Sequence, residues 1–446
     1  MSFSAAALAR VLEDELPPGA TGLVVALSGG ADSGCLAAAV AALARDGGLP
    51  PVRAVHVDHG LQAAAAEFRA VCERLCSAIS LPLTIVKPPP IAAGPGVSLE
   101  AAARDARYAV LARDLRAGEC LLTAHHAEDQ AETLLLQALR GSGLAGLASM
   151  PRRRRLGPGW HLRPLLAWSR ADLERCAAAF DVATMCDPMN EDLRFDRVYL
   201  RRRVWPPLAA RWPGAAATLT RTAQHAAEAQ DLLNEVAADD LGCLRDGNGL
   251  SIPHLRRLAP ARRVNAVRAW IAAQGPPPPT ARLTEALRQI LHARSDQSPA
   301  VVWGMHALRR YRERLFVTAA TPVRLSAELS WDPRAQPTLE LGCGLGRLRA
   351  APGPGGFASN RLPALLTVRG RRGGESLKPA PAAATQTVRH LCQADGVLPW
   401  MRGALPFLYA GTALIGVGDL WMDSAWCVES RESGLRVSWE EAPSLV

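Results

Sequence analysis

One feature constrains this chain more than any other: an apolar run leads directly into a loop of small residues and then into a helical segment. The run spans residues 22–27, the loop reads Ser28-Gly29-Gly30-Ala31-Asp32-Ser33, and an alanine-rich stretch continues to residue 44. Glycine lets the backbone approach a ligand closely, and free N–H groups at a helix N-terminus attract phosphate oxygens. The pattern predicts a phosphate-binding loop at the carboxyl end of a strand.

The polar residues of the loop have separate expected roles. The hydroxyls of Ser28 and Ser33 are expected beside phosphate oxygens, whereas Asp32 would repel phosphate unless a Mg²⁺ ion lay between them. Asp32 is therefore our candidate metal ligand. The alternative is a plain turn from strand to helix in which Asp32 caps the helix.

The pattern of the first 140 residues predicts the fold around this loop. Apolar runs at 52–57, 83–86 and 120–124 alternate with amphipathic stretches at 63–79, 98–115 and 127–139. The order βαβαβαβα is typical of an α/β fold with a parallel, doubly wound, Rossmann-like sheet. Such sheets bind ligands at the carboxyl ends of their strands.

The rest of the chain is expected to form two smaller domains. We predict a first domain over residues 1–206, closed by Pro206 and Pro207, and a small helical domain over 214–320. A small α+β domain is expected over 360–435, after a loop at the proline- and glycine-rich stretch 351–356.

Charge and cysteine content limit the function classes. Of the 51 basic residues only Lys87 and Lys378 are lysines, and residues 151–206 hold 12 arginines against 7 acidic residues. Guanidinium groups suit phosphate and bases, although GC-rich codon usage would also favour arginine. The ten cysteines form no Cys-x-x-Cys pair, and no run approaches the ~18 apolar residues of a membrane helix. We expect a cytoplasmic protein without a signal peptide or membrane segment.

Two further segments carry polar side chains toward the same sheet edge. His56 and Asp58 end the second strand, where a ligand role competes with a simple loop hydrogen-bond pair. In the helix from residue 98, Arg104, Arg107 and Tyr108 share one face with Glu100. They could grip polyphosphate or RNA, and the alternative is a surface pair of Glu100 with Arg104.

The segment 123–133 opens a helix after the fourth strand and holds His125, Asp129 and Glu132. Two carboxylates about one turn apart could hold a substrate ammonium, orient an amine nucleophile or share the metal. Taken as zinc ligands, His125, His126 and Asp129 lack a fourth partner at a recognisable spacing, so a zinc site is not favoured. The alternative is that the acidic residues merely cap the helix.

These motifs together carry a family resemblance. The loop resembles the PP-loop of the ATP pyrophosphatases, which cleave ATP between its α and β phosphates, and no Walker-type Gly-x-x-x-x-Gly-Lys occurs. The whole set is similar to the tRNA(Ile)-lysidine synthetase family. The matching segments are residues 28–33, 58–61, 100–108, 125–133, 140–147, 163–166, 187–190, 196–201, 368–375, 396–402 and 418–421. Val198 departs from the family, which usually has asparagine there.

The resemblance implies a set of site residues. Catalytic roles fall to Asp32, Arg104, Asp129 and Glu132. ATP binding falls to Ser28, Gly29, Gly30, Ala31, Asp32, Ser33, His56 and Asp58, with Mg²⁺ on Asp32. Substrate binding falls to Arg107, Tyr108, His125, Asp129, Glu132, Arg197 and Arg201.

The resemblance also implies a reaction and its partners. ATP would adenylate the C2 oxygen of the wobble cytidine in the CAU anticodon of tRNA(Ile), and free L-lysine would then displace AMP. Arginine runs at 152–155, 201–203 and 369–372 would contact RNA, with a solvated surface as the alternative. Members of this family are often dimers, so a homodimer is compatible with it.

Three other functions stay open from the sequence. A tRNA thiolase of the same superfamily would need catalytic or metal-binding cysteines that are not recognisable here. A glutamine-dependent amidotransferase would need an N-terminal nucleophile such as cysteine, and Ser2 follows Met1. A non-catalytic RNA- or nucleotide-binding protein could keep the loop without its chemistry.

Overall fold

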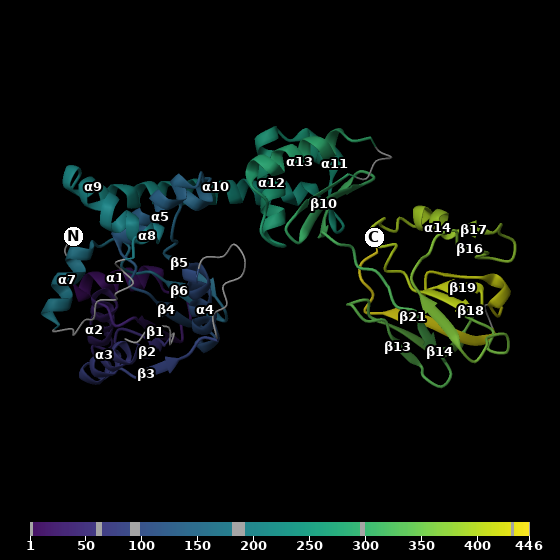
Figure 1. Cartoon of the computed structure of the whole chain (residues 1–446), viewed down its shortest axis with the longest axis horizontal. Coiled ribbons are helices and arrows are strands. Elements are labelled where there is room, and N and C mark those ends of the chain that lie inside the picture. Colours follow the sequence, from purple (N-terminus) through teal and green to yellow (C-terminus); the bar gives the residue numbers. More distant parts are fainter. Residues whose placement is uncertain are drawn as a thin grey trace. The chain divides into compact units, whose positions relative to one another are not determined.

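The structure is a computed structural model that describes residues 3–58, 65–89, 99–180, 192–294, 299–429 and 432–445. The chain forms two compact units, Met1–Leu233 and Asn234–Val446. The first unit contains the predicted phosphate loop, and Figure 1 shows its sheet and covering helices.

A six-stranded sheet in the order β3-β2-β1-β4-β6-β5 forms the centre of the first unit. Its strands pair in parallel except for β5, which runs antiparallel to β6. The predicted α/β fold and the alternation of strands and helices up to residue 139 are confirmed. The strands are β1 (Gly22–Leu27), β2 (Val52–Val57), β3 (Leu83–Val86), β4 (Glu119–Leu122), β5 (Arg153–Leu156) and β6 (Gly159–Leu162).

Helices cover both faces of this sheet because alternate strand residues point to opposite sides. Leu23 and Val25 of β1 pack with α1, α2, α3 and α7, whereas Val24 and Ala26 pack with α4. The helices are α1 (Ala5–Glu15), α2 (Ala31–Arg45), α3 (Ala65–Ala78), α4 (Leu99–Asp114), α5 (Ala127–Leu139), α6 (Leu144–Leu147), α7 (Arg170–Ala179), α8 (Asp196–Tyr199), α9 (Trp205–Arg211) and α10 (Ala215–Leu244), with a π-helical turn at Leu200–Val204.

Three features of this unit were not predicted. Helix α1 precedes the first strand, and the hairpin β5–β6 adds an antiparallel edge to the sheet. Pro206 and Pro207 lie in the first turn of α9, where proline needs no hydrogen-bond donor, and the compact unit continues to Leu233. The domain range 1–206 therefore stays a prediction.

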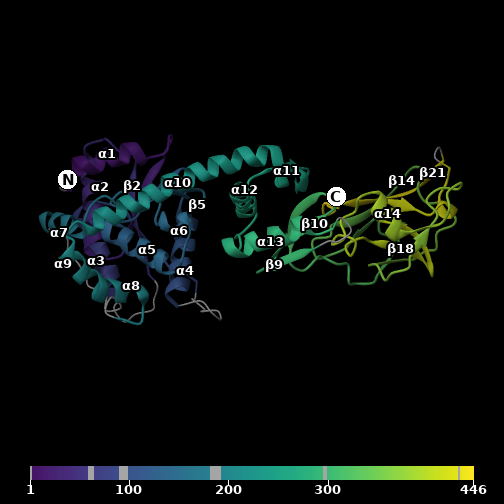
Figure 2. The same cartoon turned by 90° about the horizontal axis from the view of Figure 1, so that it is seen from above.

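The beginning of the second unit combines helices with a sheet. Helix α10 is one continuous 30-residue helix whose last part belongs to this unit (Figure 2). Three helices then pack on a five-stranded sheet in the order β7-β8-β11-β10-β9 around a core of their own. The elements are α11 (Ile252–Arg257), α12 (Pro260–Ala272), α13 (Thr280–His292), β7 (Arg245–Asp246), β8 (Gly249–Ser251), β9 (Ala300–Trp303), β10 (His306–Tyr311) and β11 (Arg314–Ala319).

The sequence predicted helices in this region but no sheet. Strand β10, for example, is short and carries two adjacent arginines, Arg309 and Arg310, so it lacks a clear apolar alternation. The range 214–320 stays a prediction for a domain.

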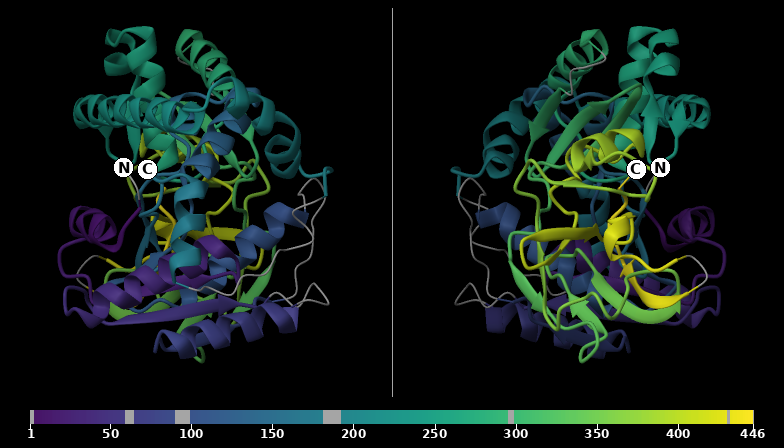
Figure 3. Two further views of the ribbon diagram at one scale, coloured as in Figure 1. Left: turned by 90° about the vertical axis from the view of Figure 1, so that its left-hand side faces the viewer. Right: turned by 90° about the vertical axis from the view of Figure 1, so that its right-hand side faces the viewer.

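The last part of the chain is a small α+β fold, as predicted. Its strands and helix are drawn in light green and yellow in Figure 3. Its sheets have the orders β12-β15-β18-β19-β20, β13-β14-β21 and β16-β17, and they share one apolar core. The elements are β12 (Leu329–Trp331), β13 (Thr338–Glu340), β14 (Arg347–Pro354), β15 (Leu366–Arg369), β16 (Ser376–Leu377), β17 (Gln386–Thr387), α14 (Val388–Ala394), β18 (Phe407–Ala410), β19 (Ala413–Val417), β20 (Trp421–Met422), a 3₁₀ turn (Ser424–Trp426) and β21 (Ser433–Glu440).

The loop expected at 351–356 is wrong for its first part, because strand β14 runs to Pro354. Pro352 and Pro354 pair with β21 on one side only, beyond the three residues of β14 that also pair with β13. Proline is tolerated at such an edge because no neighbouring strand needs its missing N–H group. The domain range 360–435 stays a prediction.

No helix in the described part of the chain is long and apolar enough to span a membrane.

Candidate active site

The predicted phosphate loop lies between β1 and α2 and is held by its own serines. The hydroxyls of Ser28 and Ser33 lie 3.0 Å apart, the backbone N–H of Ser28 donates to Ser33 Oγ (3.2 Å), and that of Gly30 donates to Ser28 Oγ (3.3 Å). Ser33 Oγ also donates to the carbonyl of Gly30 (3.1 Å). The two serines therefore shape the loop, and their predicted contact with phosphate stays a prediction.

Gly29 is the loop position that no other residue can occupy without strain. Its φ is +85°, and a Cβ there would lie 2.8 Å from Cδ1 of Phe68 in α3. Gly30 has an ordinary φ of −89°, and a Cβ there would meet only Ser28 Oγ, at 3.5 Å. The close approach of α3 therefore explains the first glycine of the loop.

Replacing Gly29 with alanine is expected to lower the free energy of unfolding by about 1–2 kcal/mol. The strained loop should also weaken ATP binding at least about tenfold, the equivalent of ~1.4 kcal/mol. The matched control is Gly30→Ala, which adds the same methyl group one residue later. Urea unfolding and equilibrium ATP binding compare the two variants, and equal losses in both would contradict the steric explanation.

Asp32 begins helix α2 with an incompletely paired carboxylate. Its Oδ1 atom is buried and has no hydrogen-bond partner among the described residues. Burial raises the pKa of Asp32, although the charges of His126 and Arg170 oppose that shift. A buried carboxylate oxygen without a partner, at the phosphate loop, fits a hard cation such as Mg²⁺. Among the described residues no cluster of three or more His, Cys, Asp or Glu side chains forms a ready-made metal site.

The two carboxylates predicted on the helix after β4 lie together and are both bound by arginines. Arg201 Nε and Nη2 donate to the two oxygens of Glu132 (2.7 and 2.8 Å), and its Nη2 also donates to Asp129 Oδ1 (3.0 Å). Arg197 Nε donates to Glu132 Oε2 (3.1 Å). We call Asp129, Glu132, Arg197 and Arg201 the carboxylate–arginine cluster.

Burial differs between the two carboxylates of this cluster. The side chain of Glu132 is 1% exposed, and that of Asp129 is 14% exposed. Burial tends to raise the pKa of Asp129, but the charges of His126, Arg197 and Arg201 hold it below its ordinary value. The same carboxylates raise the pKa of Arg201 against its burial. The four charges balance, and Asp129 is the more accessible carboxylate.

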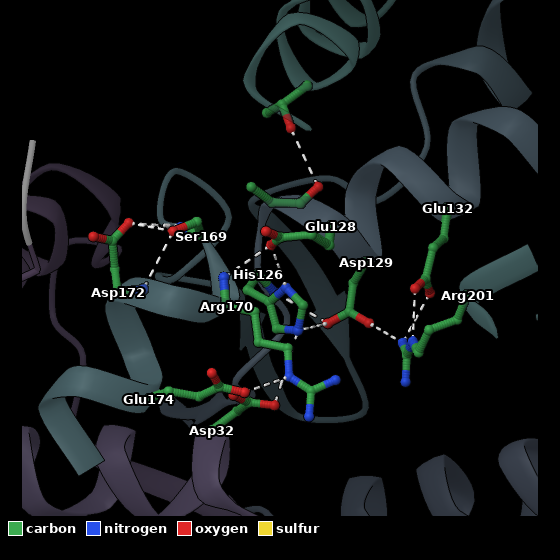
Figure 4. Close-up of polar contacts among 12 residues, drawn as sticks. Asp32, His126, Glu128, Asp129, Glu132, Ser169, Arg170, Asp172, Glu174 and Arg201 are labelled. Atoms are coloured by element: carbon green, nitrogen blue, oxygen red, sulfur yellow. Dashed lines mark hydrogen bonds and ion pairs between the residues drawn. The ribbon is translucent and has the colours of Figure 1, made fainter. Parts of the chain in front are cut away.

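His126 connects the phosphate loop to the cluster, as Figure 4 shows. Its Nε2 atom lies 3.9 Å from Asp32 Oδ2 and 3.4 Å from Asp129 Oδ2, and its Nδ1 atom lies 2.9 Å from Glu128 Oε2. Burial opposes protonation, but these carboxylates outweigh it and raise the pKa of His126. His126 was not predicted as a site residue, whereas its neighbour His125 was, although the acidic residues next to it were a signal that could have identified it.

The predicted ATP-binding residues His56 and Asp58 lie at the end of β2. His56 is buried in β2, and its Nδ1 atom lies 3.0 Å from the carbonyl of Leu27, so that nitrogen donates. Burial lowers the pKa of His56, and the charge of Arg107 adds to that shift. Asp58 follows β2 directly. Residues 59–64 and 181–191 and the side chain of Glu100 lie outside the described part of the structure.

Tyr108 and His125 both lie beside the ring of His161, and Arg104 lies over Tyr108. The guanidinium of Arg104 lies 5.4 Å from the centroid of the Tyr108 ring, and the ring of Tyr108 lies 5.3 Å from that of His161. Burial and the charges of Arg163, Arg197 and Arg104 lower the pKa of His125 to about 3, against the opposing charge of Asp129. His125 is therefore neutral in the folded protein.

Comparison with known proteins decides the family. Family models described as "PP-loop domain", "TilS substrate binding domain" and "TilS substrate C-terminal domain" match residues 3–208, 250–316 and 366–439. A tRNA(Ile)-lysidine synthase of Alkalilimnicola ehrlichii is 41% identical over 408 residues, which cover 90% of each chain. One of Pseudomonas aeruginosa is 40% identical and covers 94% of this chain and 93% of that relative. The chain belongs to the tRNA(Ile)-lysidine synthase family.

Membership of the tRNA(Ile)-lysidine synthase family confirms the resemblance found in the sequence. The chain is an enzyme of the PP-loop type and uses ATP. The curated relatives carry the name of a synthase, so a thiolase or a non-catalytic nucleotide-binding protein is not favoured. The matches at 250–316 and 366–439 also show that the second unit carries family-specific parts.

Proposed function

We propose that this protein converts the wobble cytidine of tRNA(Ile) with a CAU anticodon to lysidine, using ATP and free L-lysine. The observation that supports this most is the link from Asp32 through His126 to Asp129. It places a phosphate-binding loop beside a pair of acidic side chains that can handle an amine. The reaction takes place where tRNA is, so we expect the protein in the cytoplasm.

In the first step the C2 oxygen of cytidine attacks the α-phosphorus of ATP. The new oxygen–phosphorus bond forms while the bond from the α-phosphorus to the bridging oxygen of the β-phosphate breaks, and pyrophosphate leaves. The N-terminus of α2, with Gly30 as its cap residue, offers backbone N–H groups to the leaving phosphates. A Mg²⁺ ion held by Asp32 would supply positive charge to these oxygens. Arg104 is the exposed guanidinium that we assign to the polyphosphate.

In the second step the amine of lysine attacks C2 of the adenylated base. The carbon–nitrogen bond forms, the carbon–oxygen bond breaks, and AMP leaves with the oxygen, while the amine loses a proton. We assign lysine binding to Asp129, because its carboxylate is the more exposed of the two and is shared between several partners. Glu132 is 1% exposed and holds Arg201 with two hydrogen bonds, so its proposed role is to fix that guanidinium.

The arginines predicted to contact RNA differ in the contacts that they make within the protein. Arg201 belongs to the carboxylate–arginine cluster, and Arg154 Nε donates to His161 (3.2 Å). The Cζ atom of Arg155 lies 3.8 Å from the centroid of the Trp160 ring, and Arg152 Nη1 lies 3.7 Å from Glu15 Oε1. Both of these side chains are exposed on the edge of the sheet, so we assign RNA phosphate contact to them.

The double change Arg152→Gln/Arg155→Gln is expected to weaken tRNA binding and to reduce the salt slope of log K by about 2, one unit for each lost phosphate contact. The control is Arg45→Gln/Arg74→Gln, which removes two positive charges from another surface of this unit, on α2 and α3. Filter binding over a salt series measures both slopes. Equal slopes for the two variants would place the RNA on another surface.

The reaction is tested by pyrophosphate release from ATP. We expect release that requires a CAU-anticodon isoleucine transcript and that a methionine transcript with the same anticodon does not support. Release with any RNA, or without RNA, would keep the PP-loop chemistry and refute the proposed substrate. Size-exclusion chromatography with light scattering would test separately whether the protein is a homodimer.

A further inference from the structure

The side chain of His125 is connected by hydrogen bonds to polar side chains in the interior of the first unit. Thr123 Oγ1 lies 2.8 Å from His125 Nδ1 and 2.8 Å from His161 Nε2. Thr123 is 7% exposed and His161 is fully buried, whereas His125 is partly exposed in the site. The three side chains therefore form a chain of short hydrogen bonds from the interior to the site.

The direction of these bonds is fixed at the inner end. His161 Nδ1 receives two guanidinium donors, Arg154 Nε at 3.2 Å and Arg163 Nη2 at 3.3 Å. A guanidinium has no acceptor, so His161 Nδ1 must be the unprotonated nitrogen. Burial beside these arginines also lowers the pKa of His161 to about 2. The neutral ring then carries its proton on Nε2 and donates it to Thr123.

The remaining bond follows from the single proton of the threonine hydroxyl. Thr123 Oγ1 accepts from His161, and its own proton is left to donate to His125 Nδ1. If His125 carried its proton on Nδ1 instead, Thr123 would accept twice. Its hydroxyl proton would then be buried without an acceptor among the described residues, at a cost of about 1–3 kcal/mol.

We infer that Arg154, His161 and Thr123 are positioning residues that hold His125 as a neutral ring with its proton on Nε2. In this form His125 presents a hydrogen-bond donor to the site and cannot bind the ammonium group of lysine. It donates to an oxygen acceptor of the reacting molecules. This inference rests on the proposed function for the identity of those molecules, but the proton position itself does not depend on it.

The fold explains why residues far apart in the sequence meet here. Arg154 of β5 pairs directly with His161 of β6, and the backbone N–H of Thr123 bonds to the carbonyl of Leu162 (3.1 Å). Arg163 follows β6 and donates to the carbonyl of Pro151 (2.6 Å) as well as to His161. The unpredicted hairpin thus connects an edge of the sheet to the site.

Nuclear magnetic resonance of the full chain with ¹⁵N-labelled histidine tests the proton position directly. The signals of His125 are assigned by their loss in His125→Asn. We expect long-range ¹H–¹⁵N correlations in which Nε2 is protonated and Nδ1 is not, from pH 8 down to pH 5. A proton on Nδ1, an average of both forms, or a charged ring would overturn the inference.

Two variants test the role of the hydroxyl with matched shape. Thr123→Val removes the hydroxyl and is expected to lose the fixed form of His125 and to lower kcat/KM by about 10–100-fold, as for outer partners that orient functional histidines. Thr123→Ser keeps the hydroxyl and should restore the spectrum and most of the activity. The KM values for ATP, lysine and tRNA identify which molecule supplies the oxygen acceptor.

The outcomes separate this inference from the proposed function. If Thr123→Val keeps wild-type activity and the wild-type spectrum, the positioning role is refuted while lysidine formation stands. If Thr123→Val does not fold, the wild-type spectrum still tests which ring nitrogen of His125 carries the proton. If the wild-type protein makes no lysidine, the proposed function fails, and the spectrum still tests the proton position.

Discussion

The change Asp32→Asn is expected to slow pyrophosphate release by about 10²–10³-fold while making the ligand-free protein more stable. The change removes the carboxylate that would hold positive charge against the leaving phosphates, a loss that typically lowers kcat by about 10²–10³-fold. The same carboxylate has a buried oxygen without a partner among the described residues, and burial raises its pKa. The side chain is 32% exposed, so removing this partly buried charge should raise the free energy of unfolding by at most about 1 kcal/mol.

This prediction is measured in two experiments. Urea unfolding without ATP or metal gives the stability of Asp32→Asn and of the wild type, and a pyrophosphate assay gives their rates. A variant that is both inactive and less stable would mean that Asp32 supports the fold rather than the chemistry. An active variant would remove Asp32 from the proposed catalytic set.

The change Glu132→Gln is expected to lower the free energy of unfolding by about 3 kcal/mol, which is typical for removing one partner of a buried ion pair. Glu132 is 1% exposed and binds both Arg197 and Arg201. Without the charge of Glu132, Asp129 is the one carboxylate that the two guanidinium groups still share among the described residues. Lysidine formation should fall as well, because glutamine offers Arg201 one neutral acceptor oxygen in place of two carboxylate oxygens.

The control for Glu132→Gln is the same substitution in an exposed pair. Glu73 binds Arg69 at 2.8 Å on the surface of α3, with both side chains about half exposed. Glu73→Gln should cost no more than about 0.5 kcal/mol. Calorimetric or urea unfolding compares the two variants, and similar losses would contradict the structural role that we give to the carboxylate–arginine cluster.

Local sequence patterns were sufficient to predict the loop and the sheet that carries it. The alternation of apolar runs with amphipathic stretches matched β1 to β4, and the predicted loop forms the turn at Ser28 to Gly30 and the start of α2. Such features depend on residues that are near one another in the chain, so their physical signals are visible without a structure.

Contacts between distant residues were not predictable from local pattern. Arg197 and Arg201 were carried over as site residues by resemblance, but their partners Asp129 and Glu132 lie 65 to 72 residues away. The hairpin β5–β6 was hidden because Arg153–Leu156 reads as a basic run without apolar alternation. His126 was passed over because its role depends on Asp32, which a different strand–helix turn supplies.

The central claim is tested most directly by the chemistry of the RNA product. Purified protein is incubated with ATP, L-lysine and the CAU-anticodon isoleucine transcript, and nuclease fragments of the RNA are weighed by mass spectrometry. We predict that the anticodon fragment gains the mass of lysine less one water at the wobble cytidine, only when ATP and lysine are both present. An unmodified cytidine, or the same gain on the methionine transcript, would contradict the proposed function.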